Sequence, residues 1–287
     1  MTARNVVVFG GGHGAAAALQ GARRYAASVT GVISVADDGG SSGRLRELLD
    51  VVAVGDLRRC LLALASEPNP WEAVFQHRFG AGELNGHAVG NLILAGLIDL
   101  HGELLTGLAA AGDLLGCVGT VLPATSEPVV LAAETDLGCV TGQAAITKAG
   151  GITSVRLDPE RPRVPDAVLD AIASADQILI GPGSLYTSVL ASVIAPAITD
   201  ALDATAAQVV YLCNLQQQVP ESSGYSVAHH VDALARHGIT PDVVVCDTSL
   251  GMELGSIELE YVDAPLALSN RPMHDPSRLA AIVSPLA

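Results

Sequence analysis

Residues Val35 to Arg44 read VADDGGSSGR, and no other ten residues are as informative about this chain. Two adjacent carboxylates, Asp37 and Asp38, end an apolar run, and a loop rich in glycine and serine follows and ends in arginine. A β-strand that leads into such a loop places carboxylates, hydroxyls and bare backbone N–H groups at one point in space. Those groups suit a sugar hydroxyl, a phosphate or a bound cation.

Two further glycine loops accompany this stretch: GGGHG at Gly10–Gly14 and GPGSLYTS at Gly181–Ser188. The first follows a predicted strand and opens a predicted helix, which is the context of a dinucleotide-binding fingerprint. Helix N-termini favour anions, and Asp37 or Asp38 would then bond a ribose hydroxyl. The alternative is that the glycines only permit a tight turn, with His13 facing solvent. Together the three loops predict a nucleotide or phosphorylated ligand.

Composition narrows the class of protein. The chain has 287 residues, 49% of them hydrophobic and only 16% charged, which is enough for a sizeable core. Its net charge of −15 and single lysine, Lys148, argue against nucleic acid as a partner. Five scattered cysteines without a C-x-x-C pair are typical of free thiols in a reducing compartment. Because no secretory signal or long apolar run is evident, we expect a cytoplasmic protein without membrane insertion.

The strand pattern predicts an α/β fold. Five runs are apolar nearly throughout, as in parallel strands covered on both faces: Val6–Phe9, Val29–Val35, Gln177–Ile180, Val209–Cys213 and Val243–Cys246. Helical patterns separate them, which favours a Rossmann-like three-layer sandwich with a mostly parallel sheet. Residues 117–157 instead show short extended segments broken by proline and glycine. We predict one domain over 1–287, with a small antiparallel β-rich subdomain at about 117–157 that begins with Val118–Leu122.

Several helices carry candidate site residues or lie close to them. The predicted helices are Ala15–Tyr25, Asp56–Ser66, Trp71–Phe79, His87–Leu100, Thr106–Leu115, Asp166–Ala175, Val227–His237 and Pro276–Val283. Asp56 is interpreted either as a ligand contact or as a helix N-cap. His87 and Asn91, at a glycine-rich helix start, are candidates for ligand binding or for bracing a loop. Asn214 follows a strand at the carboxyl edge of the sheet, where open α/β folds bind ligands.

The sequence lacks the motifs that define some enzyme classes. The P-loop pattern is absent, and the esterase-like Gly39-x-Ser41-x-Gly43 lacks both an apolar approach to the serine and an oxyanion loop. His229 and His230 are neighbours on a predicted helix, so they face different directions and cannot form a metal pair. No metal-ligand or nucleophile motif is therefore specific enough to define a reaction.

Eight segments in order point to one family. They read FGGGHG, VADDGGSSGRLR, GDLRRCL, FQHRF, LNGHAVGNLIL, VLPATSEPV, GPGSLYTS and VYLCNLxxQ, and they span roughly residues 5 to 248. This set closely resembles the gluconeogenesis factor family of the YvcK type, a sister group of the 2-phospho-L-lactate transferases of the CofD type. The resemblance implies a CofD-like fold and a cytoplasmic protein needed for cell shape and growth on gluconeogenic carbon sources.

The resemblance also implies a ligand. Family members are thought to bind UDP-sugars, UDP-N-acetylglucosamine in particular, and to regulate cell-wall precursor synthesis rather than catalyse a known reaction. The carried-over positions and the two bracing candidates form this set: Gly11, Gly12, His13, Gly14, Asp37, Asp38, Ser41, Ser42, Asp56, Arg58, His87, Asn91, Gly183, Ser184, Thr187 and Asn214. The implied partners are a nucleotide sugar or dinucleotide, cell-wall synthesis proteins and a second copy of the chain.

The chain departs from the family pattern in three places. His13 replaces the usual threonine, and Gln216–Pro220 replaces a common M-T-Q-P-G. Beyond Thr248 the sequence diverges, and Arg271 and His274 are the candidates for contacts to the base there.

Two alternatives remain open. In a transferase of the 2-phospholactate type, Asp37, Asp38 and Asp56 would bind Mg²⁺ on a guanosine-diphosphate-linked donor while an acceptor hydroxyl attacks phosphorus. In an NAD-dependent oxidoreductase, the first glycine loop would hold the dinucleotide. That activity requires an acid or base near the nicotinamide, and no residue in the sequence is an obvious choice for it.

Overall fold

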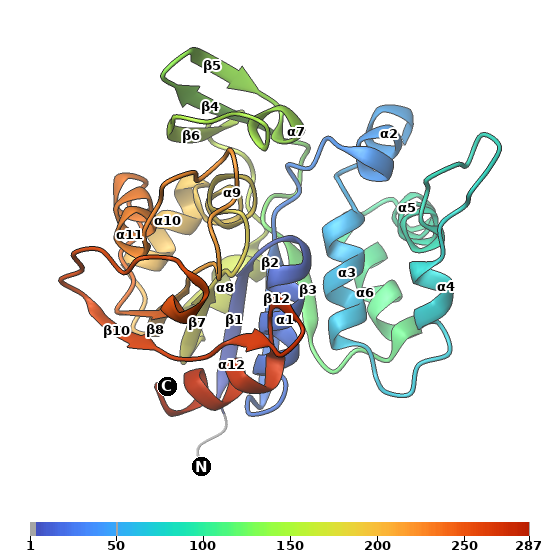
Figure 1. The fold of residues 1–287 in the computed structure, drawn as a ribbon. Helices are drawn as coiled ribbons and strands as arrows, with labels where there is room; N and C mark the ends of the chain where they lie inside the picture. The colour runs from blue at the N-terminus through green and yellow to red at the C-terminus, as the bar shows by residue number, and fades with distance from the viewer. Residues whose placement is uncertain (1–3, 50, 287) are drawn as a thin grey trace.

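The computed structural model describes residues 4–49 and 51–286, and a seven-stranded parallel sheet lies at its centre (Figure 1). Across the sheet the strands run β10 (Glu260–Asp263), β9 (Val243–Cys246), β8 (Gln208–Leu212), β7 (Gln177–Ile180), β1 (Asn5–Gly10), β2 (Ser28–Ile33) and β3 (Thr120–Pro123). All neighbouring pairs are parallel. Strands β7 and β9 are buried along their whole length, which explains why their sequences are apolar except for Gln177 at the start of β7. The predicted α/β fold class is confirmed.

Helices cover both faces of the sheet and form a lobe at its β3 side. They are α1 (Gly12–Ala22), α2 (Gly40–Leu49), α3 (Gly55–Leu64), α4 (Glu72–Gln76), α5 (Val89–His101), α6 (Leu104–Leu115), α7 (Gln143–Ile146), α8 (Asp166–Ala173), the π-helix η1 (Leu185–Leu190), α9 (Ala191–Val193), α10 (Pro196–Asp203), α11 (Val227–Arg236), the 3₁₀ helix η2 (Thr248–Leu250), α12 (Pro276–Val283) and the 3₁₀ helix η3 (Ser284–Leu286). Helix α1 contacts α3 and α12 on one face, whereas α8 and α10 contact each other on the other (Figure 1).

The structure of the helical lobe contradicts the prediction of a loop after Asp38. The stretch after Asp38 is not a loop throughout, because α2 begins at Gly40 and the N–H of Gly43 donates to the carbonyl of Gly39 at 2.9 Å. The glycines and serines occupy only the first turn, and strong helix formers follow from Arg44 onward. Helices α2 to α6 lie together at the right of Figure 1.

The predicted β-rich segment is partly confirmed. Strands β4 (Val130–Thr135), β5 (Gly138–Thr141) and β6 (Ile152–Asp158) form an antiparallel sheet in the order β5-β4-β6, at the top of Figure 1. The prediction that Val118–Leu122 belongs to this segment is wrong, because β3 pairs with β2 at the edge of the main sheet. Pro123 is tolerated there because it ends an edge strand.

Two pieces of regular structure near the C-terminus lie outside the predicted elements. Strand β10 is mostly exposed at the other edge of the main sheet, so its sequence EYVD does not carry an apolar signature. Strands β11 (Ala267–Leu268) and β12 (Arg271–His274) form a small hairpin before α12. Helix α12 has the bounds predicted for it, and it packs on α1.

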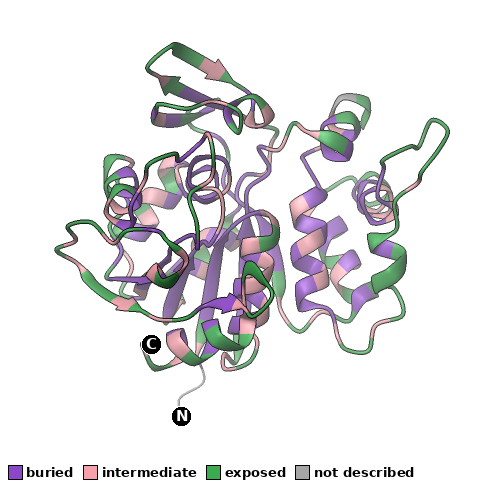
Figure 2. Ribbon diagram, in the orientation of Figure 1, coloured by how far each residue is buried: buried purple, intermediate pink, exposed green. Residues whose placement is uncertain are grey.

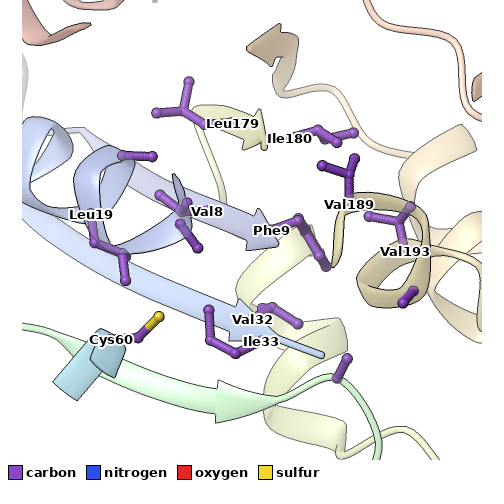
Figure 3. Packing of buried hydrophobic residues seen from close by; sticks show 14 of the residues in the cluster. Val8, Phe9, Leu19, Val32, Ile33, Cys60, Leu179, Ile180, Val189 and Val193 are labelled. Atoms are coloured by element: carbon purple, nitrogen blue, oxygen red, sulfur yellow. The ribbon is translucent and has the colours of Figure 1, made fainter. Parts of the chain in front are cut away.

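The core lies between the sheet and its helices. Figure 3 shows Leu19 of α1 over β2, where the closest side-chain carbon of Leu19 lies 3.1 Å from the position of a Cβ on Gly31. Val189 and Val193 pack beyond Phe9, and burial in Figure 2 is concentrated in the strands and the inner helix faces. Among the described residues, no single helix is long and apolar enough to cross a membrane. Leu185–Val193 and Pro196–Ala204 reach that length and apolar composition only when the two are counted together, and the chain bends sharply between them.

Candidate functional site

The strand order creates a topological switch point. Strands β1 and β7 are neighbours, but the chain leaves β1 toward β2 and leaves β7 toward β8, so the connections diverge above their carboxyl ends. Open α/β sheets bind ligands at such a point. The loops that follow β1, β7 and β8 therefore form the natural place to look for a site.

The first and third glycine loops are pressed against each other there. A Cβ built on Gly14 would lie 2.1 Å from the carbonyl oxygen of Pro182, so only glycine fits at this position. The loop after β8 joins them, because the side-chain oxygen of Asn214 accepts a hydrogen bond from the N–H of Gly183 at 3.1 Å. The amide nitrogen of Asn214 in turn donates to Gln218 at 3.1 Å.

A cavity of about 270 Å³, here called the switch cavity, opens at this junction. It is lined by His13, Gly14, Ala17, Pro182, Gly183, Asn214, Leu215, Gln216, Gln217, Gln218, Pro272, Met273 and His274. Four of these are site residues predicted from the sequence, and His274 is the candidate for base contact. Arg271 is exposed and does not line the cavity.

The N-terminus of α1 supplies backbone donors to the switch cavity. The first N–H groups of a helix have no partner within the helix. Here a carboxylate oxygen of Asp56 accepts from the N–H of Gly12 at 2.7 Å, and Ala15 donates to the carbonyl of Gly11 at 3.3 Å. His13 and Gly14, whose N–H groups belong to the first turn and so have no partner within the helix, both line the cavity, where the helix dipole would favour a negatively charged ligand.

His274 lines the switch cavity in a neutral form. Burial lowers its pKa to about 4, and its Nε2 lies 3.2 Å from the carbonyl oxygen of Cys213. Because a carbonyl only accepts, Nε2 carries the proton and Nδ1 is an acceptor. The lining of the cavity thus combines the start of α1 with side-chain amides and a neutral imidazole.

The acidic loop reaches the first glycine loop through α3. Asp37 accepts from the N–H of Gly39 at 2.9 Å and a hydrogen bond from Ser42, while burial raises the pKa of its carboxyl group. A Cβ on Gly55 would lie 2.3 Å from the Ser42 hydroxyl, which brings this cluster against the start of α3 and Asp56. Asp38 turns elsewhere: it is exposed and accepts from the N–H of Ala144 in α7 at 2.8 Å.

The predicted metal ligands do not form a preformed site. Asp37, Asp38 and Asp56 each accept hydrogen bonds from different segments, as described above. Over residues 4–49 and 51–286, no group of three or more His, Cys, Asp or Glu side chains is arranged to hold a metal ion. The role of Asp37, Asp38 and Asp56 as metal ligands therefore stays a prediction.

Ser41, His87 and Asn91 form a buried cluster. The Ser41 hydroxyl lies 3.0 Å from Nδ1 of His87, and the Asn91 amide donates to the same hydroxyl at 3.0 Å. Burial is also the main cause that lowers the pKa of His87. These bonds join the first turn of α2 to the start of α5, which favours the bracing interpretation over ligand binding.

Thr187 and Ser184 hold the third glycine loop rather than line the cavity. The Thr187 hydroxyl donates to buried Glu221 at 2.9 Å, and the N–H of Tyr186 donates to the same carboxyl group at 2.9 Å. The Ser184 carbonyl accepts from the N–H groups that follow it in η1. Glu221 was missed by sequence reasoning. Its only signal was an acid placed directly after Pro220.

Arg58 lies in α3 on the other side of His13. It is 5% exposed, its Nη1 donates to the carbonyl of Phe75 at 2.9 Å, and it lines a second cavity together with Arg59 and Arg78. Neither Arg59 nor Arg78 was singled out from the sequence, because their proximity depends on how α3 and α4 pack.

Comparison with known proteins defines the class. The family model of 2-phospho-L-lactate transferase CofD matches residues 6–268. A solved structure of a member of the UPF0052 family from Bacillus halodurans has a TM-score of 0.93 and 36% identity, with 99% of both chains covered.

Relatives with assigned names refine this placement. The gluconeogenesis factor of Halalkalibacterium halodurans is 43% identical over 251 residues, covering 85% of this chain and 78% of that protein. The gluconeogenesis factor of Bacillus subtilis is 41% identical over 235 residues, covering 81% and 74% respectively. The chain therefore belongs to the CofD family and, within it, to the gluconeogenesis factors.

Proposed function

We propose that this protein binds a nucleotide sugar of the UDP-N-acetylglucosamine type in the switch cavity and acts as a cytoplasmic regulator. The regulated process would be cell-wall precursor synthesis, and with it cell shape, on gluconeogenic carbon sources. The observation that carries the proposal is the cavity at the switch point, which is lined by the first turn of α1 and by the amide side chains of the loop after β8.

The cavity chemistry suits a nucleoside diphosphate. The diphosphate would accept hydrogen bonds from the N–H groups of His13 and Gly14, where the helix dipole stabilises negative charge. The uracil or ribose would meet the amides of Asn214 and Gln218 and the acceptor Nδ1 of His274. Pro272 and Met273 supply apolar surface for a ring.

His13 would be neutral beside such a ligand. Burial is the main cause that lowers its pKa, and the charges of Arg59 and Arg58 lower it further while Asp56 opposes them. Because these causes disfavour a charged imidazole before any ligand binds, the backbone dipoles at the start of α1 are expected to supply the initial attraction for the diphosphate. Binding through dipoles also explains how a chain with net charge −15 could accept an anion here.

Differential thermal stabilisation tests the proposal. The purified protein is heated with UDP-N-acetylglucosamine, UDP, uridine, GDP or NAD at matched concentrations. A ligand at one hundred times its Kd stabilises the folded state by about 2.7 kcal/mol. We expect UDP-N-acetylglucosamine to raise the melting temperature most and uridine least. Equal shifts for uridine and UDP would contradict diphosphate recognition, and a larger shift with NAD would favour the dinucleotide alternative.

The transferase alternative has one observation in its favour, which is the match to the family model named for 2-phospho-L-lactate transferase. In that case Asp56, which accepts a hydrogen bond from the first glycine loop, and Asp37, which lies near the start of α3, would help to hold Mg²⁺ on the transferring group. Incubation with a guanosine-diphosphate-linked donor, a deazaflavin acceptor and Mg²⁺ separates the two functions. Turnover would overturn the purely regulatory role.

A further inference from the structure

A second cavity of about 310 Å³ lies between α1, α3 and α4. Three of the chain's 15 basic residues, Arg58, Arg59 and Arg78, line it. His13 lines both this cavity and the switch cavity, so one side chain separates the two spaces. We call this space the arginine cavity.

The buried arginine in this cavity is incompletely satisfied. The Nε of Arg58 is buried and has no hydrogen-bond partner among the residues that the structure describes. Its neighbours Arg59 and Arg78 carry the same charge, and burial together with these two guanidinium groups lowers the pKa of Arg58 to about 10. A buried donor without a partner is costly, more so when it is charged. An anion in the cavity would relieve both the unmade bond and the repulsion.

The carboxylates near the arginine cavity do not neutralise its three guanidinium groups. Arg59 contacts Asp56 at 2.5 Å, and Asp56 also accepts from Gly12, so one carboxylate serves two donors. Arg78 donates to the carbonyl of Gly86 at 2.8 Å rather than to an acid. Glu72 is exposed and accepts from Gln76 at 3.0 Å, and both of these side chains line the cavity. Of the three guanidinium groups, only that of Arg59 forms an ion pair with a carboxylate among the described residues.

We propose that the arginine cavity binds the phosphoryl group of a second small ligand, a phosphate monoester. Guanidinium groups present several N–H donors in a fixed fork that matches the oxygens of a phosphate, and a dianion balances more of their charge than a carboxylate does. In the proposed complex the Arg58 side chain rotates so that its Nε, which is closed off from solvent in the ligand-free structure, also donates to the anion, and Arg59 and Arg78 donate from the more exposed side of the cavity. The ligand is separate from the nucleotide sugar.

The two cavities are coupled through Asp56. A phosphate that bonds to Arg59 competes with Asp56 for that guanidinium group. Asp56 in turn holds the N–H of Gly12 beside the proposed diphosphate position. A change at one cavity is therefore transmitted to the other, and by linkage each ligand alters the affinity of the other by the same factor.

The experiment uses inorganic phosphate as the probe. Phosphate is titrated calorimetrically into the full chain at constant ionic strength, with acetate as the carboxylate control. The titration is repeated in the presence of saturating UDP-N-acetylglucosamine. We expect saturable binding of phosphate, weaker or no binding of acetate, and retention of the phosphate site when the nucleotide sugar is present.

Matched variants locate the site. Arg78→Gln and Arg24→Gln both replace an exposed arginine, but only Arg78 lines the cavity. We expect Arg78→Gln to weaken phosphate binding at least about tenfold, as for the loss of one charge-assisted hydrogen bond, and Arg24→Gln to leave it unchanged. Arg58→Lys, which keeps the charge but removes Nε, is expected to weaken it as well, with circular dichroism as the check on folding.

Three results would overturn the proposal: no saturable phosphate binding, equal affinity in Arg78→Gln and Arg24→Gln, or complete displacement of phosphate by the nucleotide sugar. Displacement would instead assign the phosphate to the switch cavity. Because phosphate binding is measured on the ligand-free protein, failure of the nucleotide-sugar proposal would leave this test intact.

Discussion

The Asp56 carboxylate accepts a hydrogen bond from the backbone N–H of Gly12 at 2.7 Å, across 44 residues of sequence. The first free N–H donor of α1 is therefore bonded to a carboxylate of the protein itself. From the glycine fingerprint alone, that donor would be assigned to a ligand phosphate. The other Asp56 oxygen contacts Arg59 at 2.5 Å. One side chain therefore connects the switch cavity, the arginine cavity and the start of α3.

Asp56→Asn tests this connection. The asparagine oxygen can still accept from Gly12, but the negative charge beside Arg59 is removed. Because Asp56 no longer competes for Arg59, we expect phosphate to bind the arginine cavity a few-fold more tightly. The ion pair is partly buried, with side-chain exposures of 26% for Arg59 and 18% for Asp56, so we also expect a modest loss of stability, on the order of 1 kcal/mol. A calorimetric phosphate titration measures the effect, and weaker phosphate binding in the variant would contradict it.

Gly14→Ala tests the contact between the first and third glycine loops. The new Cβ would lie 2.1 Å from the backbone oxygen of Pro182, so one of the two loops must move. We expect a loss of roughly 1–3 kcal/mol in the free energy of unfolding, together with loss of UDP-sugar binding. Chemical denaturation and calorimetry measure the two effects.

Gly96→Ala is the matched control, because Gly96 also lies in a helix and a Cβ added there would meet no atom within 4 Å. Its expected effect is a gain of up to about 1 kcal/mol from helix propensity. If both variants were equally stable and bound ligand equally, the loops would not be held as described.

Asn214→Asp tests diphosphate recognition. The carboxylate can still accept from the N–H of Gly183, so the loop contact is kept, but a negative charge enters the switch cavity. We expect the affinity for UDP-N-acetylglucosamine to fall by about tenfold or more, while the weak binding of uridine changes little. An equal loss for both ligands would show that Asn214 acts on the nucleoside or on the loop alone.

Stability should decline as the pH falls from about 6.5 to 4. Burial lowers the pKa of His230 and of His274 to about 4, whereas an unfolded histidine titrates near 6.5. In this interval the unfolded chain binds protons that the folded chain does not, so each histidine removes on the order of 3 kcal/mol by pH 4. Burial raises the pKa values of Asp37 and Glu221. The contribution of these two groups to stability therefore increases as the pH falls, which is opposite to the contribution of the histidines.

A variant isolates the histidine contribution. His230→Asn keeps a hydrogen-bonding group near the hydroxyl of Tyr211, with which Nδ1 of His230 interacts at 2.8 Å, but it does not titrate. Denaturant unfolding at pH 7, 6 and 5 should therefore show a shallower loss of stability for the variant than for the natural chain. Parallel pH profiles would mean that His230 does not resist protonation in the fold.

The buried strands were predictable, and the edge strands were not. After a polar first residue in β1 and β7, strands β1, β7 and β9 are apolar because both faces are covered, and the sequence carries that pattern directly. β10 is half solvated, and β3 precedes an antiparallel segment of similar composition, so neither has a distinctive period. The start of α2 resembles a loop in sequence because its first turn contains the glycines and serines that also form turns.

The site was only half predictable for a related reason. Gly14 is fixed by a close backbone approach, which a glycine motif indicates locally. Gln216–Gln218, Met273 and Arg78 reach their cavities through tertiary packing and carry no local pattern. Conversely, Thr187 resembles a ligand contact in the sequence, but its hydroxyl is hydrogen-bonded to another side chain of the protein. The sequence does not tell which polar groups form such internal hydrogen bonds.

The most direct measurement is a crystal structure of the protein with UDP-N-acetylglucosamine. We expect the diphosphate to lie within hydrogen-bond distance of the N–H groups of His13 and Gly14, with the nucleoside between Asn214 and His274. A nucleotide sugar bound away from the switch cavity, or with its diphosphate turned away from the N-terminus of α1, would contradict this expectation.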